Sequence, residues 1–201
     1  MRPQHKVFAF ITSFRPRLHQ LGVVILLLFA THITNAAGFT IKEAHASFDQ
    51  TALSVDAKFD LQLSDAVSEA LHNGVSIQLL TTLDLFTTRP YIWDPRIAQW
   101  VFTQQIRYHS LTNRYILTSP QQVGSRSYSS LSDLFSDIES FRFQSDISGE
   151  TLPASKRGYK LQLRIALDNS ILPAPLRVMT YIRPSWKLRS KIYEWSISSQ
   201  P

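Results

Sequence analysis

The side chains that could carry acid–base or nucleophilic chemistry are few and lie far apart in the sequence. Beyond residue 36 the chain has three histidines, His45, His72 and His109, and it has no cysteine anywhere. A nucleophilic serine needs a histidine within hydrogen-bonding reach and a third group that orients this histidine. None of the three histidines lies in a motif of that kind, so each is expected to be an ordinary surface or hydrogen-bonded side chain. The sequence therefore predicts a non-catalytic protein.

Metal and phosphate sites are equally unsupported by the spacing of residues. Three isolated histidines without cysteine form no zinc-ligand pattern, and no HExxH or EF-hand spacing occurs. The six glycines never approach the GxGxxG or GxxxxGK spacing that cradles phosphate groups. Asp56 and Asp60 lie on one strand face, but Lys58 between them favours a solvated ladder of alternating charges over a glycosidase pair. We expect neither a metal nor a cofactor.

The first 36 residues predict an export signal. They contain four basic residues and no acid, followed by the apolar run LGVVILLLFA at positions 21–30. This run is far shorter than the ~20 residues that span a bilayer, and small residues that suit signal cleavage follow it. We expect cleavage after Ala36 rather than a retained membrane anchor. Residues 37–201 would then form a single domain in a bacterial periplasm.

Charge is distributed unevenly along the chain. The first 36 residues hold four of the 21 basic residues and none of the 15 acidic ones, so the remainder is close to neutral. The high isoelectric point of the whole chain therefore gives no reason to expect nucleic-acid binding. Residues 156–201 nevertheless hold nine basic side chains and two acidic ones, which makes the C-terminal part a basic segment.

The cations of this basic segment share strand faces in two groups. Lys160 and Arg164 lie on the polar face of one expected strand, and Lys187, Arg189 and Lys191 on a face of another. Adjacent strands would bring them together as a positive patch. The favoured interpretation is that this patch pairs with the acidic ladder elsewhere in the fold. The alternative is contact with an anionic membrane surface or an acidic partner.

The stretch TTRPYIWDP, at positions 87–95, has two aromatic residues and an acid between two prolines, with an arginine directly before the first proline. Prolines end strands and start turns, so we expect a corner between two long strands. Tyr91 and Trp93 would fold over the end of the core, and Arg89 would pair with Asp94. The alternative is a binding site formed by Arg89, Tyr91 and Trp93.

The elements that must position these residues follow from hydrophobic periodicity. Alternation predicts strands at 39–48, 53–63, 75–87, 96–109, 114–118, 141–147 and 159–167, with one or two more within 177–182 and 186–197. Helical stripes behind capping serines predict two short helices, at 64–73 and 130–138. Half-buried strands joined by hairpins favour a mainly β fold. We expect an antiparallel β-sandwich or a curled, partly open barrel, with the helices covering its ends or an open edge.

Three segments resemble a known family. They are EALHNGVSIQLL through YIWD, the hairpin RYHSLTNRYIL, and LDNSILPAPLRV followed by SWKLRS. The chain is similar to an exported proteobacterial family classed as a domain of unknown function, DUF4390. The best-matching residues are Tyr108, His109, Leu111, Tyr115, Leu172, Pro173 and Pro175. The resemblance implies an exported protein without established activity, and relatives encoded beside a membrane sensor histidine kinase imply an accessory role in envelope signalling.

Three functions follow as hypotheses, of which the third is an enzyme of unrecognised type. The first is a non-catalytic periplasmic binding or interaction protein that uses exposed aromatic residues and its basic C-terminal face. The second is a carrier that encloses a small apolar or lipid ligand within a curled sheet.

Overall fold

The computed structural model describes residues 37–48, 52–88, 93–145, 147 and 158–197. These residues belong to one compact unit, Ala37–Pro201. The expected export segment, residues 1–36, lies outside the described residues. Among the residues that are described, no helix is both long and apolar enough to cross a membrane.

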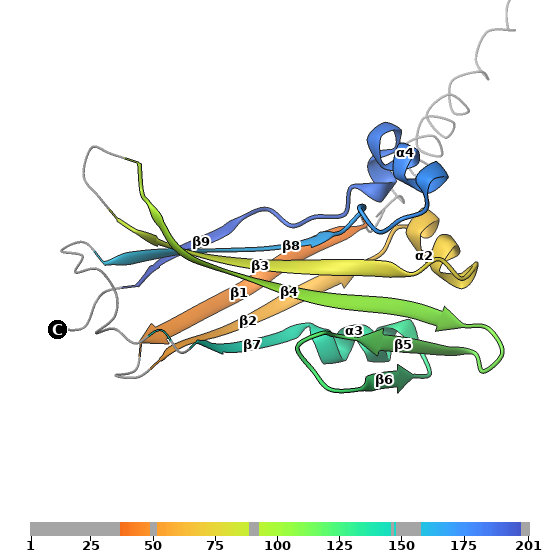
Figure 1. The fold of residues 1–201 in the computed structure, drawn as a ribbon, viewed down its shortest axis with the longest axis horizontal. Coiled ribbons are helices and arrows are strands. Elements are labelled where there is room, and N and C mark those ends of the chain that lie inside the picture. The colour runs from red at the N-terminus through yellow and green to blue at the C-terminus, as the bar shows by residue number, and fades with distance from the viewer. Residues whose placement is uncertain (1–36, 49–51, 89–92, 146, 148–157, 198–201) are drawn as a thin grey trace, which may run out of the picture. The chain divides into compact units, whose positions relative to one another are not determined.

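Nine strands and three α-helices make up the described chain (Figure 1). The strands are β1 (Gly38–Phe48), β2 (Leu53–Gln62), β3 (Ile77–Thr87), β4 (Arg96–His109), β5 (Arg114–Thr118), β6 (Ser125–Tyr128), β7 (Ser140–Ser145), β8 (Tyr159–Leu167) and β9 (Tyr193–Ile197). The helices are α2 (Asp65–His72), α3 (Leu131–Ile138) and α4 (Ala174–Ile182), and a 3-10 turn, η1 (Pro184–Trp186), follows α4.

The strands form two antiparallel sheets that pack as a sandwich. One sheet has the order β1-β2-β7, and the other has the order β6-β5-β4-β3-β8-β9. Each described sheet keeps two edge strands, so neither closes into a barrel. The structure confirms the predicted fold class in its sandwich form.

Strict alternation in three central strands builds the core between the sheets. In β2, β3 and β8 nearly every second side chain is buried, as period-two strands with one wet face require. Leu53, Leu85 and Leu163 are completely shielded from solvent. Burying an aliphatic side chain of this size stabilises a fold by about 1.5–3 kcal/mol, so these strands dominate the stability of the domain.

Aromatic contacts join the two sheets along both sides. Phe102 of β4 lies with its ring centroid 5.0 Å from that of Phe141 of β7. On the other side, the rings of Phe48 in β1 and Tyr159 in β8 meet edge-on at 5.5 Å. Aromatic pairs at such distances add to the energy of simple burial, so they fix how the sheets face one another.

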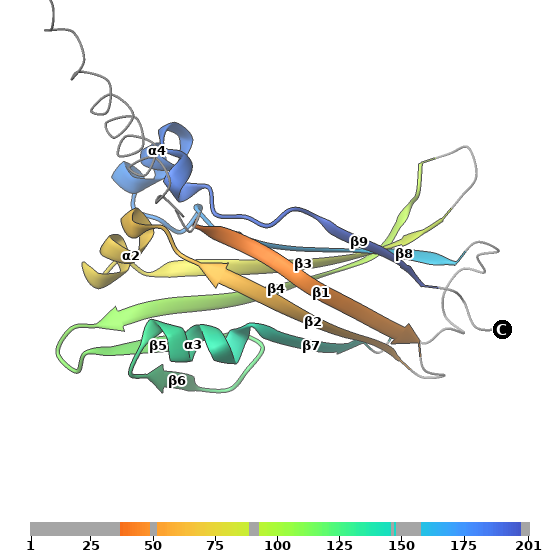
Figure 2. The same cartoon turned by 180° about the vertical axis from the view of Figure 1, so that it is seen from behind.

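Both predicted helices are confirmed, with the caps that the sequence indicated. Ser64 accepts a hydrogen bond from the Val67 amide at the start of α2, and Ser130 does the same for Asp133 at the start of α3. Helix α2 ends where Gly74 adopts a positive φ of 86°, a left-handed conformation that favours glycine. Helix α3 packs against β5, β6 and β7 at one side of the sandwich (Figure 2).

The expected strand at 177–182 is wrong, because these residues belong to helix α4. Pro173 occupies the N-cap position without a capping hydrogen bond from its side chain, and Pro175 lies in the first turn, where a missing amide proton costs no intrahelical hydrogen bond. The two prolines therefore start a helix here instead of merely interrupting a strand. Within the expected strand at 186–197, only Tyr193–Ile197 forms a strand, β9. Arg189 forms an isolated β-bridge to Ala166. Strand β6 was not predicted, because its residues are mostly exposed and polar.

Candidate functional site: a cationic end beside helix α4

The segment after η1 alternates between anchoring and exposed side chains. Trp186, Leu188 and Ser190 are buried, whereas the cations Lys187, Arg189 and Lys191 between them are exposed. The backbone of this segment runs beside β8, where Leu188 accepts a hydrogen bond from the Leu167 amide at 2.8 Å. Alternate burial therefore holds the cations on the solvent side, although most of the segment is no regular strand.

Helix α4 is held at both ends. The Arg177 amide donates to the Pro173 carbonyl at 3.0 Å, and the Arg183 amide donates to the Met179 carbonyl at 2.8 Å. The turn η1 that follows is tied to the start of α2, since the Ser64 hydroxyl donates to the Ser185 carbonyl at 2.7 Å. Figures 1 and 2 show α2 and α4 at the same end of the sheets, beside the start of β1.

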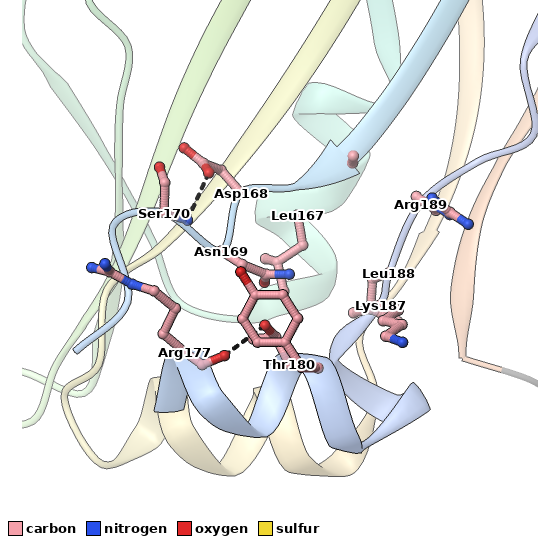
Figure 3. Close-up of a pocket in the computed structure, with 11 residues that line it drawn as sticks. Leu167, Asp168, Asn169, Ser170, Arg177, Thr180, Lys187, Leu188 and Arg189 are labelled. Atoms are coloured by element: carbon pink, nitrogen blue, oxygen red, sulfur yellow. Dashed lines mark hydrogen bonds between the residues drawn. The ribbon is translucent and has the colours of Figure 1, made fainter. Parts of the chain in front are cut away.

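A pocket of about 600 Å³ lies between α4, the end of β8 and the segment 187–189. Figure 3 shows Arg177 on one side of this pocket and Lys187 with Arg189 on the other. The Arg177 guanidinium donates one hydrogen bond, to the Leu172 carbonyl at 3.1 Å. None of the three cations forms an ion pair with any residue that the structure describes. We call Arg177, Lys187, Arg189 and helix α4 the cationic end.

The one carboxylate in the pocket lining is already occupied by neutral donors. One oxygen of Asp168 accepts from the Ser170 amide at 2.8 Å, and the other accepts from the Gln78 side chain at 2.9 Å. Beside it, the buried Asn169 Oδ1 accepts no hydrogen bond from the described residues. The pocket thus offers three cations, and its carboxylate is held by neutral groups. Such an arrangement attracts an anion.

The cationic strip continues past the pocket. Arg189 also borders a second groove of about 520 Å³, together with Lys191 and the β1 residues Phe39 and Ile41. Arg189 therefore belongs to both hollows, and the exposed cations of this segment face two neighbouring concave surfaces.

The other two predicted cations do not join this site. Lys160, at the start of β8, lies 2.8 Å from a carboxylate oxygen of Asp94 and 3.8 Å from one of Glu194. The hydrogen bond to Asp94 raises the pKa of Lys160 above its usual value. Arg164 is exposed on the same β8 face, opposite Thr82. The single patch expected from five cations is therefore wrong for Lys160, which is neutralised by its own acidic neighbours, whereas the segment with Arg189 does lie beside β8 as expected.

The acidic ladder is confirmed, but its partners are not the C-terminal cations. On the outer face of the three-stranded sheet, Arg142 lies 3.5 Å from Asp56, Lys58 lies 2.7 Å from Glu43, and Lys42 lies 3.2 Å from Asp60. Hydrogen bonding to Lys58 lowers the pKa of Glu43. We call these six residues the paired face. The expected pairing of the ladder with the basic C-terminal face is wrong, because β1 and β7 supply nearer cations.

Trp93 does not cover the end of the core. Its side chain is 94% exposed, so the expected aromatic plug is wrong for this residue. The Thr87 amide donates to the Pro95 carbonyl at 3.1 Å, so Trp93 lies in the connection beyond this last pairing of β3 with β4. Arg89 and Tyr91, the other candidates of this segment, lie outside the described residues.

The histidines take structural positions, one of which the sequence did not indicate. His72 Nδ1 lies 2.7 Å from the Ser68 carbonyl oxygen, which can only accept, so this nitrogen is the donor. His72 Nε2 lies 2.7 Å from the Tyr115 hydroxyl, which joins α2 to β5. His109 contacts the Thr112 hydroxyl within its own turn at 3.1 Å. Among the described residues, no three potential metal-binding side chains come together.

Comparisons with known proteins identify a family but no individual relative. A family model described as "Domain of unknown function (DUF4390)" matches residues 36–196. No curated protein and no solved structure matches the chain.

Proposed function

Since this chain belongs to the DUF4390 family, whose description assigns no activity, we propose a function from the geometry of its surface. The protein is a non-catalytic binding protein of the bacterial envelope, and it contacts an anionic partner through the cationic end.

The observation that carries this proposal is the unpaired state of three cations around one pocket. Arg177, Lys187 and Arg189 are exposed, and none has a carboxylate partner among the described residues. Cations of the paired face each have a carboxylate within 3.5 Å. A cation whose charge is not neutralised internally keeps its attraction for an external anion, which favours encounter and orientation.

The proposed location rests on the N-terminal segment, and the proposed class of partner rests on the family resemblance. The basic and apolar N-terminal segment supports export to the periplasm, and mass spectrometry of the N-terminus of the exported protein tests it. An accessory role beside a membrane sensor histidine kinase, which the family resemblance implies, is one form that the binding function can take.

A carrier of a small apolar or lipid ligand is the alternative function. An opening of about 450 Å³ lies beside α3 and β4, and Phe59, Phe102 and Phe141 form part of its lining. The same lining includes the charged Arg126, Asp137 and Arg142, which suit an apolar ligand poorly. Native mass spectrometry of freshly purified protein tests this alternative, because a carried ligand adds a defined mass.

In-cell crosslinking tests the binding function. One variant combines Arg177→Gln, Lys187→Gln and Arg189→Gln, and a control combines Lys42→Gln, Lys58→Gln and Arg142→Gln on the paired face. Both variants lose the same net charge, so a nonspecific effect of charge would appear equally in both. Crosslinked products are identified by mass spectrometry after crosslinking of intact cells.

We expect the cationic-end variant to lose crosslinks to envelope components that the wild type and the control keep. A protein partner at the cationic end is ruled out if the two variants give the same crosslinks, or if the wild type gives none in several growth conditions. Thermal unfolding of both variants checks the fold, and we expect wild-type stability because exposed side chains contribute little to it.

A further inference from the structure

Helix α4 presents an apolar surface to solvent, which is the reverse of an ordinary surface helix. Val178, Tyr181 and Ile182 are 56%, 76% and 69% exposed. Their i, i+3, i+4 spacing places them on one side of the helix. Only Thr180 is buried in α4, whereas α2 and α3 both bury apolar residues in the core. We call Val178, Tyr181 and Ile182 the α4 stripe.

The α4 stripe cannot turn inward without breaking contacts of the helix. The Thr180 hydroxyl donates to the Arg177 carbonyl at 2.7 Å on the opposite, buried side. Leu176, on that same side, packs against the core. The turn η1 directly after the helix is fixed by the buried Trp186. The stripe is therefore a stable feature of the surface.

Basic residues flank the α4 stripe in the sequence, with no acid among them. From Asn169 to Tyr193 the chain has no aspartate or glutamate. The same segment has five cations, Arg177, Arg183, Lys187, Arg189 and Lys191. All five are exposed, so an apolar strip and a cationic rim share one end of the domain.

We propose that the anionic partner of the cationic end is the surface of an anionic phospholipid bilayer, into which the α4 stripe inserts. This inference rests on the proposed function and names its partner. The helix lies in the interface, with its stripe among the acyl chains and its cations at the headgroups.

A bilayer fits this surface for three physical reasons. An apolar stripe with a cationic rim is the composition of helices that lie in a membrane interface. A helix of nine residues is too short to span a bilayer, which takes about 20. Tyrosine, here Tyr181, suits the boundary because its ring is apolar and its hydroxyl remains wet.

The pocket beside α4 extends this contact to single lipid headgroups. Arg177 and Lys187 border it on opposite sides, so the pocket is a region of positive charge that an anionic headgroup can enter. Each Lys or Arg near an anionic surface strengthens binding about fivefold. This attraction is screened by salt, so the affinity for anionic vesicles must fall as ionic strength rises.

A site-specific fluorescent label tests the insertion of the α4 stripe. The chain has no native cysteine, so Ile182→Cys places a polarity-sensitive fluorophore on the stripe alone. Leu111→Cys is the matched control, because Leu111 is 90% exposed on the β4–β5 hairpin, far from α4 in sequence. The full exported chain carries the label and is mixed with vesicles of phosphatidylcholine, alone or with phosphatidylglycerol.

We expect a blue shift of the label at residue 182 with phosphatidylglycerol vesicles, and none at residue 111. The inference is overturned if the label at 182 does not respond, or if both labels respond equally. A response at 182 to pure phosphatidylcholine of the same size also contradicts it, because charge would then play no part.

Unlabelled variants separate the apolar contribution from the charged one. Val178→Gln, Tyr181→Gln and Ile182→Gln together should weaken vesicle binding about tenfold or more, since their apolar area can no longer be buried. The control, Trp93→Gln, Leu111→Gln and Val123→Gln, changes three exposed apolar residues elsewhere and should bind as the wild type does. Equal binding of both triple variants would contradict insertion through α4.

The outcomes also separate this inference from the proposed function. If the Arg177, Lys187 and Arg189 variant loses a protein crosslink in cells while vesicles leave the label at 182 unchanged, the binding function stands and the bilayer is wrong. If neither crosslinks nor vesicle binding depend on these cations, the proposed function itself is wrong.

Discussion

The paired face and the cationic end are both rich in charged residues, yet they use charge in opposite ways. On the paired face, each of three carboxylates has a cation within 3.5 Å. That cation comes from a neighbouring strand of the same sheet. At the cationic end, Arg177, Lys187 and Arg189 have no such partner among the described residues. Exposed ion pairs add little stability, so the difference concerns what each surface attracts. One surface is neutralised within the fold, and the other keeps its charge for something outside it.

The largest expected effect comes from the residues that position the unpaired cations. Leu188→Ala removes a buried side chain between Lys187 and Arg189 and should lower the free energy of unfolding by about 2–5 kcal/mol. Lys187→Ala removes an exposed cation and should change it by less than about 0.5 kcal/mol. Urea unfolding measures both. Equal losses would show that the cation itself stabilises the fold, and the contrast between the two surfaces would disappear.

A smaller effect is expected at Lys160, a C-terminal cation that is paired. Lys160→Met removes its contacts with Asp94 and Glu194 and should lower the free energy of unfolding by up to about 1 kcal/mol. Arg189→Met, at the cationic end, should lower the free energy of unfolding by less than Lys160→Met does. Pairing raises the pKa of Lys160, so this stabilisation is present below the usual lysine value of 10.5 and is lost as pH rises through the higher pKa of the folded state. Unfolding of the wild type and of Lys160→Met at neutral and at strongly alkaline pH tests whether this stabilisation is lost as pH rises.

Acid should affect the paired face and leave the cationic end unchanged. Hydrogen bonding to Lys58 lowers the pKa of Glu43 below its usual 4.5. The stabilisation of the fold by the Glu43–Lys58 pair is therefore present above pH 4.5. It is lost as pH falls through the lower pKa of Glu43 in the folded state. Thermal unfolding of Glu43→Gln should lack this part of the acid dependence seen in the wild type. An identical acid dependence in both proteins would mean that the Glu43–Lys58 pair contributes nothing.

The smallest effect is expected at Trp93, which belongs to neither surface. Its side chain is 94% exposed, so Trp93→Ala should leave the free energy of unfolding within about 0.5 kcal/mol of the wild type. Chemical unfolding followed by circular dichroism measures it. A loss of several kcal/mol would restore the idea that this residue covers the core.

Local patterns predicted the sheets well because their physical cause is local. The alternation in β2, β3 and β8 reflects one buried face, and the serine caps of α2 and α3 act within three residues. Helix α4 escaped prediction because its sequence, APLRVMTYI, is rich in β-branched and aromatic residues, which favour strands.

The candidate site was predicted only in part, for reasons of distance. Lys187, Arg189 and Lys191 were identified from charge and spacing alone, and they do line the two hollows of this end. Arg177 was missed as a member, because only the turn of the chain into α4 brings it opposite Lys187. The neutralisation of Lys160 by Asp94 depends on tertiary contact across 66 positions, which no local pattern reports.

The strand order has a consequence for how the domain folds. Leu53 in β2 pairs with Ser145 in β7, and Leu79 in β3 pairs with Leu167 in β8, so both sheets depend on residues made about 90 positions later. Sheets built from such distant pairings fold slowly, in milliseconds to seconds, because long loops must close before the contacts stabilise them. On a nascent chain the three-stranded sheet cannot be completed until β7 has been synthesised, and the six-stranded sheet cannot be completed until β9 has been synthesised. Slow folding would suit the export that we propose, because a chain that is still open can be threaded through a narrow translocation channel.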